Sequence, residues 1–84
     1  MIEPRLTVAL GATAAHALLG RTVSVMRERG HITRFRDGLP GFITVHPSFL
    51  LRLPHAAARA REHARLIDDL RHVAELVPAV RLAA

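Results

Sequence analysis

The chain has 84 residues and a formal net charge of +5, and all 12 of its Lys/Arg residues are arginine. Apolar residues make up 50% of the sequence, which excludes a disordered tail and predicts one small folded domain. Because the sequence has no cysteine, it excludes disulfides, thiolate zinc sites and cysteine-ligated iron–sulfur clusters within these residues.

The first predicted unit is a strand followed by a helix. Leu6 to Leu10 is a short β-prone run that ends at Gly11, and it reads as a buried strand. Ala12 to Leu19 is rich in good helix formers, and Gly20 provides the stop signal. We therefore expect an α/β unit whose apolar helix lies on a sheet.

A hairpin and a second buried strand are predicted next. Val23 to Met26 alternates like a half-buried strand, Arg27 to Gly30 reads as a turn, and His31 to Arg36 alternates again. These two alternating segments could pair as a β-hairpin. Turn formers fill Asp37 to Gly41, and Phe42 to Val45 is predicted as the second buried strand.

A long amphipathic helix is predicted to close the chain. Phe49 to Pro54 is a short apolar loop or helical turn, and His55 to Val77 repeats apolar residues at helical spacing. The apolar positions are Ala56, Ala60, Ile67, Leu70, Val73, Ala74 and Val77. Pro78 is expected to end the helix, leaving Ala79 to Ala84 as a short tail. The two buried strands with a helix between them predict part of a parallel sheet, hence an α/β fold.

The segment His46-Pro47-Ser48 is the first candidate site. It terminates the second buried strand, since Pro47 cannot donate to a ladder. In open α/β sheets, ligands bind at the carboxyl ends of strands. His46 is therefore either a ligand-binding residue or a buried histidine that caps the strand.

Five short stretches in a fixed order carry a family resemblance. They are Val8 to Ala15, Ala17 to Gly20, Arg29-Gly30, Thr44 to Ser48 and Leu51-Arg52. In this order and spacing they resemble the C-terminal half of family-4-type uracil-DNA glycosylases, over about residues 6–77. The resemblance implies a partial three-layer α/β/α sheet of the uracil-DNA glycosylase-like fold. It also implies that residues 1–84 form a single partial domain, the C-terminal half only.

The resemblance assigns roles to residues of the loop after the second strand. His46 matches the motif histidine that hydrogen-bonds a carbonyl oxygen of the flipped uracil, where negative charge grows as the glycosidic bond breaks. Ser48 could bind a DNA phosphate. Leu50, Leu51 and Arg52 match the loop that enters the duplex where the base leaves. Alternatively, one of the two leucines packs beneath the last helix.

A second DNA contact is expected at the predicted hairpin. Arg29 matches the basic position of the family's Arg-Gly hairpin, and Arg27, Arg34 and Arg36 add positive charge around it. Solvated surface charge is an equal alternative, because no aromatic residues are interleaved to stack on bases. Glu28 and Asp37 also dilute the charge.

Other parts of the family's apparatus have no match in this sequence. These are the Gly-Glu-x-Pro-Gly-like segment that positions the attacking water, the aromatic residue that stacks on uracil, and the iron–sulfur cysteines. We therefore expect a fragment or subunit of a base-excision DNA repair hydrolase, with no cofactor in this chain and little or no excision alone. Its expected partners are uracil-containing DNA and either a complementary N-terminal half or a second copy. The alternatives are a non-catalytic DNA-binding or interaction module and a nonfunctional gene remnant.

Neither a membrane nor a metal partner is predicted. No apolar run approaches the ~20 residues that a membrane helix needs, and Met1 to Arg5 does not resemble a signal peptide. The expected location is therefore the cytoplasm. No two histidines have i, i+4 spacing, and His55, His63 and His72 are eight and nine positions apart, which indicates a helix surface rather than a metal site.

Overall fold

A mixed sheet with helices on both faces organises the molecule. Residues 6–77 and 79–84, which the computed structural model describes, form four strands and four helices. In chain order these are β1 (Leu6–Leu10), α1 (Ala12–Leu19), α2 (Val25–Glu28), β2 (Ile32–Arg34), β3 (Pro40–Thr44), α3 (Ser48–Leu51), α4 (Ala56–Leu76) and β4 (Val80–Ala83). The α/β class expected from the sequence is confirmed.

The sheet has the strand order β2-β3-β1-β4. The central strand β1 runs parallel to both β3 and β4, with Val8 opposite Phe42 on one side and Leu82 on the other. β2 is antiparallel to β3 and pairs Ile32 with the same Phe42. The expected parallel pairing of the two buried strands is therefore confirmed.

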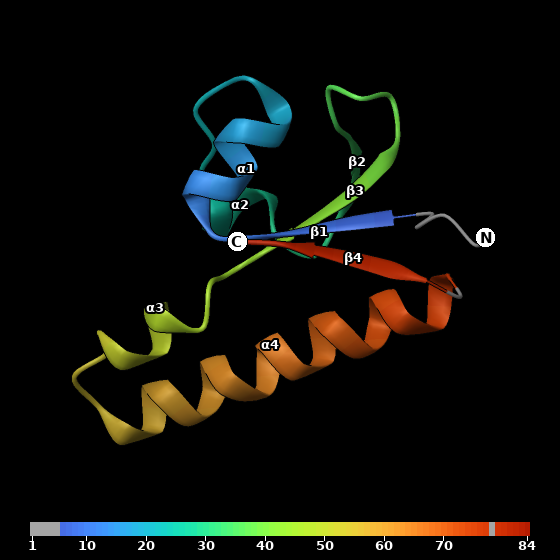
Figure 1. Cartoon of the computed structure of the whole chain (residues 1–84). Coiled ribbons are helices and arrows are strands. Elements are labelled where there is room, and N and C mark those ends of the chain that lie inside the picture. Colours follow the sequence, from blue (N-terminus) through green and yellow to red (C-terminus); the bar gives the residue numbers. More distant parts are fainter. Residues whose placement is uncertain (1–5, 78) are drawn as a thin grey trace.

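Alternate residues of β1 and β3 feed two separate cores, because neighbouring side chains of a strand point to opposite faces. α1 and α2 cover one face of the sheet and α4 covers the other (Figure 1). The core beneath α1 and α2 consists of Ala9, Ala14, Ala15, Val23, Phe35 and Ile43. The core beneath α4 consists of Leu6, Val8, Phe42 and Val73.

The strand and helix predicted for residues 6–20 are confirmed with the expected bounds. Gly11 makes the turn between them at a φ of 93°, and its N–H donates to the Thr44 carbonyl at 2.9 Å. Gly20 ends α1 in the left-handed conformation, with its N–H bonded to the His16 carbonyl. The turn therefore ties the start of α1 to the end of β3.

The strand predicted for Val23 to Met26 is wrong. Ser24 begins a single helical turn instead, since the N–H groups of Arg27 and Glu28 both donate to its carbonyl. A four-residue alternation fits one helical turn as well as a strand, and here the turn lets Val23 reach the core. β2 consequently pairs with β3, so the hairpin lies one element later than predicted.

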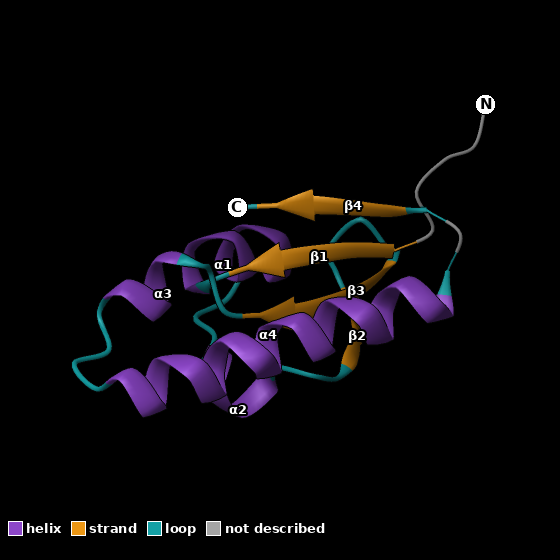
Figure 2. Cartoon of the chain, turned by 90° about the horizontal axis from the view of Figure 1, so that it is seen from below, coloured by secondary structure: helices purple, strands orange, loops and turns teal. Residues whose placement is uncertain are grey.

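The tail predicted for Ala79 to Ala84 is also wrong. Val80–Ala83 forms β4, which adds to the free edge of β1. α4 crosses the sheet and ends near the start of β1 (Figure 2). The four residues of β4 have little intrinsic strand preference, but there they can pair with the exposed edge of β1. Pro78, the predicted helix stop, lies outside the described residues, as does Met1 to Arg5; α4 ends at Leu76.

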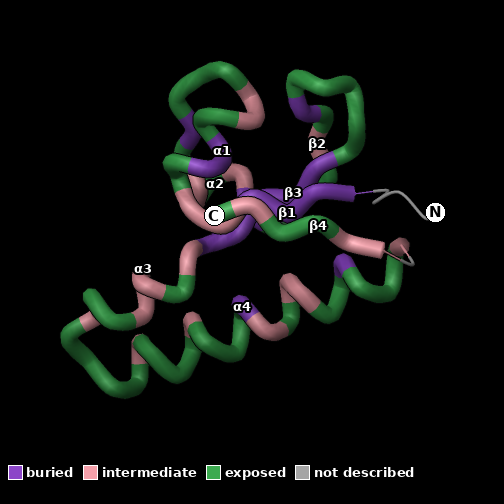
Figure 3. Tube along the Cα trace, in the orientation of Figure 1, coloured by how far each residue is buried: buried purple, intermediate pink, exposed green. Residues whose placement is uncertain are grey.

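The predicted long helix is confirmed, but its apolar stripe is only partly right. Val73 and Leu66 are its buried residues, and Leu66 was not among the predicted positions. Ala56 and Ala60 are exposed because the first half of α4 extends past the sheet (Figures 1 and 3). This half meets α3 rather than the core beneath the strands.

The two outer strands leave apolar side chains accessible. β2 and β4 are the edges of the sheet, where Ile32 is 49% and Leu82 is 60% exposed. Unpaired strand edges offer backbone donors and acceptors to a further strand.

We predict that Gly41→Ala destabilises the fold by about 1–3 kcal/mol, the usual effect of overpacking a core. A Cβ atom at Gly41 would overlap the ring of Phe35, which is itself buried. Urea unfolding followed by circular dichroism measures the change. In a double-mutant cycle, Phe35→Leu should relieve part of the effect; strictly additive losses would contradict the contact.

Candidate functional site

A cavity of about 480 Å³ opens at the carboxyl ends of the parallel strands. The arrowheads of β1, β3 and β4 all point toward this end of the molecule, where α3 also lies (Figure 2). The lining residues come from the β1–α1 turn, α2, the end of β3, α3 and the last residue. They are Leu10, Gly11, Ala12, Thr13, Val25, Met26, Val45, His46, Ser48, Phe49, Arg52 and Ala84. This is the position at which open α/β sheets bind ligands.

His46 is held in one orientation by the residue that follows Pro47. Its Nδ1 atom accepts the backbone N–H of Ser48 at 3.0 Å and lies 2.9 Å from Ser48 Oγ. Since Nδ1 accepts a hydrogen bond, the proton of the neutral ring resides on Nε2. The half-buried imidazole lines the cavity, and in this tautomer its free donor is the Nε2–H group.

The loop after His46 forms a short helix that divides its side chains between the cavity and solvent. The N–H of Phe49 donates to the His46 carbonyl at 2.9 Å, which starts the turn of α3. Ser48 and Arg52 line the cavity together with His46. Leu51 points away and is 84% exposed, whereas Leu50 is half-buried where α3 packs against α4.

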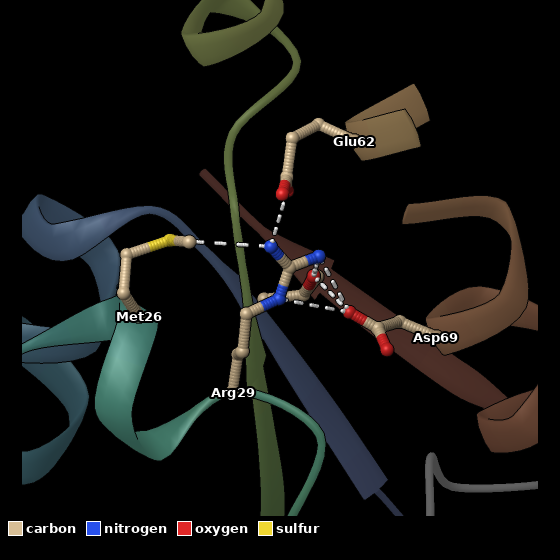
Figure 4. Close-up of polar contacts among 5 residues, drawn as sticks. Met26, Arg29, Glu62 and Asp69 are labelled. Carbon is tan, nitrogen blue, oxygen red and sulfur yellow. Dashed lines mark hydrogen bonds and ion pairs between the residues drawn. The ribbon is translucent and has the colours of Figure 1, made fainter. Parts of the chain in front are cut away.

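Arg29 lies elsewhere than expected, because its side chain has no exposed surface. Its guanidinium sits between two acids of α4, with Nη1 at 2.8 Å from Glu62 and Nη2 at 3.0 Å from Asp69 (Figure 4). A buried and doubly paired guanidinium cannot reach a phosphate. We therefore correct the expected DNA contact: Arg29 is a structural residue behind the cavity.

Thr44 joins this ion-pair network to the strand that carries His46. Its hydroxyl donates to Asp69 Oδ2 at 2.6 Å, and its carbonyl accepts the N–H of Gly11 at 2.9 Å. Met26, whose sulfur contacts Arg29 Nη1 at 4.0 Å, lines the cavity itself. The network therefore forms the support immediately behind the cavity wall.

Of the other arginines expected in the hairpin, Arg34 and Arg36 are remote from the cavity, whereas Arg27 lies on α2, next to the cavity-lining Met26. The β2–β3 turn precedes Pro40, whereas His46 follows the other end of β3. Five strand residues separate the two ends, which corresponds to about 16 Å. Arg34 in this hairpin donates to the Gly38 carbonyl, so the structure does not bring Arg34 or Arg36 to His46.

Sequence reasoning missed the two acids that hold Arg29. Glu62 and Asp69 are seven residues apart and thus lie on one face of a helix, two turns from each other. Acids at this spacing on the inner side of an amphipathic helix indicate a buried cation. Met26 and Thr13 in the cavity wall carried no comparable signal.

No model of a known protein family matches the chain. The part of the chain that the structure describes contains no group of three or more His, Asp or Glu side chains that could hold a metal ion. None of the helices in residues 6–77 and 79–84 has the length and apolar character that a membrane span requires. The cavity and the Arg29 ion-pair network behind it are therefore the candidate functional features of the described residues.

We predict that Arg29→Met destabilises the protein by about 3 kcal/mol, because Glu62 and Asp69 would keep their partly buried charges without a partner. A domain of this size has a total stability of only about 4–13 kcal/mol. Chemical denaturation measures the loss. The matched control is Arg21→Met, because Arg21 forms an exposed pair with Glu28 at 2.8 Å and lowers the pKa of that carboxyl through its hydrogen bond. Similar losses in both variants would contradict the structural role of Arg29.

We also predict that the neutral His46 ring carries its proton on Nε2. Nitrogen-15 NMR of the imidazole distinguishes the two tautomers. The Nε2–H form should dominate and should fall in population in Ser48→Gly, where the hydroxyl is lost and the backbone gains freedom. A dominant Nδ1–H form would contradict the hydrogen bond from the Ser48 amide.

Proposed function

We propose that this chain is a fragment or subunit of a uracil-DNA glycosylase-like base-excision repair protein. It binds DNA and a flipped uracil through the loop His46-Pro47-Ser48. The observation that carries the proposal is the Nε2–H donor of His46 in a cavity at the strand ends. The ordered resemblance to the C-terminal half of family-4-type uracil-DNA glycosylases supports it, and so does the confirmed α/β class.

Uracil suits the chemistry of this cavity. Its carbonyl oxygens accept hydrogen bonds, and Leu10, Val25 and Phe49 provide apolar walls for the faces of the ring. A volume of about 480 Å³ lies within the usual range of small-molecule sites. When the N-glycosidic bond breaks, the electron pair stays on the base, and a donor from His46 stabilises the resulting anion. One such preorganised donor typically contributes about 3 kcal/mol in the transition state.

The proposed DNA contacts surround the mouth of the cavity. Leu51, with 84% of its surface exposed on α3, is available to enter the base stack in place of the departing nucleotide. Arg52 reaches the cavity rim, where it can pair with a phosphate or fill the vacated space. Ser48 orients His46, and we assign its hydroxyl a phosphate contact as well. Leu50 is half-buried on α3, the helix that packs against α4.

Binding without efficient hydrolysis is part of the proposal. No Asp or Glu side chain lines the cavity in the described part of the chain, so the cavity lacks an acidic group for activating a water, and in this proposal its histidine, His46, serves the leaving base. The same observation favours a second candidate, a non-catalytic DNA-binding or interaction module. A complementary N-terminal half, or a second copy added at the β4 edge, is the proposed protein partner. The proposed location is the cytoplasm.

We predict that the chain binds DNA with one uracil more tightly than the same DNA with a tetrahydrofuran abasic site, which has no base carbonyl. His46→Ala should reduce this preference by about 2- to 10-fold, the effect of one net hydrogen bond, and leave binding to the abasic DNA unchanged. Competition fluorescence anisotropy on single-stranded and duplex oligonucleotides measures both quantities. The matched control is His31→Ala, because His31 is exposed and lies outside the cavity.

An excision assay completes this test. End-labelled DNA with one uracil is incubated with the chain and treated with alkali, and we expect no strand cleavage. Cleavage that His46→Ala lacks would show that the chain alone is a complete glycosylase. Equal affinity of the folded wild-type chain for uracil DNA and abasic DNA would refute uracil recognition and leave the DNA-binding module.

A further inference from the structure

The charges of α4 and the residues that lead into it are divided between its two ends. From residue 52 to residue 65 there are four arginines and one acid, Glu62, which is bound to the buried Arg29. From residue 66 to residue 76 there is one arginine and three acids. The arginines of the first group are Arg52, Arg59, Arg61 and Arg65, which we call the basic end of α4.

This distribution does not favour the helix itself. A helix is stabilised by acids in its first turn and by cations in its last turn, because its dipole is positive at the N-terminus. α4 has no acid in its first turn and no base in its last turn. Arg61 and Arg65 are also like charges at i, i+4, which repel each other. Features that act against local stability are expected where a surface serves binding.

The basic end is exposed and largely free of internal partners. Arg52, Arg61 and Arg65 are exposed, and no ion pair involves them among residues 6–77 and 79–84. Arg59 donates one Nη1 hydrogen bond to the Leu53 carbonyl at 2.6 Å and is otherwise exposed. Figure 3 shows the first half of α4 as mostly exposed, and Figure 2 shows that it lies beside α3 at the cavity end of the molecule.

We propose that the basic end of α4 binds the phosphate backbone of duplex DNA next to the cavity. The identity of the polyanion rests on the proposed function. Arg61 and Arg65 are four residues apart and therefore share one face of the helix, about 6 Å apart along its axis, which suits two neighbouring phosphates of one strand; Arg59 is turned away from this face, toward the Leu53 carbonyl. The proposed phosphate contact thus replaces the one expected at Arg34 and Arg36, which lie away from His46.

An anionic membrane is less suited to the same surface. Helices that lie on membranes insert an apolar face between the lipid head groups. The apolar side of α4 is engaged instead, because Leu66 and Val73 are buried and Val73 packs in the core beneath the sheet. Duplex DNA requires only exposed cations, and these are what the basic end provides.

The test measures how salt weakens binding to an undamaged duplex without uracil. For each phosphate contact, the slope of log K against log salt is about 0.9 steeper. The variant Arg61→Gln/Arg65→Gln should therefore make the slope shallower by about 1.8 and weaken binding at low salt. The matched control, Arg34→Gln/Arg71→Gln, also removes two positive charges from exposed positions, and its slope should stay at the wild-type value.

Urea unfolding of both variants checks that the fold is intact. Because Arg61 and Arg65 repel each other, their replacement should leave the unfolding midpoint unchanged or slightly higher. Equal slopes in the wild type and Arg61→Gln/Arg65→Gln would overturn the proposal, as would equal losses in both variants. Binding to phosphatidylserine vesicles that depends on these two arginines, with an unchanged DNA slope, would also overturn it in favour of a membrane.

The result can be separated from the test of uracil recognition. The preference for uracil over an abasic site is a ratio that depends on His46, whereas the salt slope is measured on DNA without uracil. A shallower slope in Arg61→Gln/Arg65→Gln together with no uracil preference in the wild type would support the phosphate-binding surface and refute uracil recognition. The converse result would overturn the surface alone.

Discussion

The burial of the Arg29 guanidinium between Glu62 and Asp69 determines how the long helix lies on the sheet. A guanidinium without exposed surface must find counter-charges, because an unpaired buried cation is strongly disfavoured. Two acids seven residues apart meet it only in one rotation of α4 and one position along its axis. The buried apolar contact of α4 is small, since only Leu66 and Val73 are fully enclosed. The ion pairs therefore fix the orientation of α4 on the sheet, which apolar packing alone would define poorly.

The same network determines the position of the cavity. Asp69 accepts the hydroxyl of Thr44, and Thr44 in turn accepts the amide of Gly11 at the β1–α1 turn. One point thus connects the last helix, the end of β3 and the start of α1, which are far apart in sequence. His46 follows Thr44 by two residues, so any shift of α4 would be transmitted to the wall that carries the imidazole. The rigidity of the cavity wall therefore depends on the pairing of Arg29 with Glu62 and Asp69.

The sequence predicts the elements whose structure depends on neighbouring residues, and it does not predict those whose structure depends on contacts with distant parts of the chain. Three parts of the fold were predictable, because composition and periodicity are read within a short window of sequence. They are the strand and helix of residues 6–20, the buried strand before His46 and the long last helix. Val23 to Met26 was misread because four alternating residues fit a strand and a helical turn equally well. β4 was not predicted, because its residues form a strand only by pairing with the edge of β1. Arg29 was misplaced because its partners lie 33 and 40 residues away, and no local pattern distinguishes a buried arginine from a surface one.

At the candidate site, the segment His46 to Ser48 was predictable as a strand end, whereas the hydrogen bond that orients the ring required the structure. That bond supports a division of labour in the proposed function. A single donor at His46 can stabilise a leaving base, but hydrolysis also needs a water held and activated on the opposite side of the sugar. The cavity wall in the described residues includes Arg52 and Ser48 but no acidic side chain, which fits the proposed recognition of a base and its phosphates. In the proposed function, the water-positioning group comes from outside the described residues, and it has to reach the cavity end of the sheet, where α3 and the basic end of α4 lie.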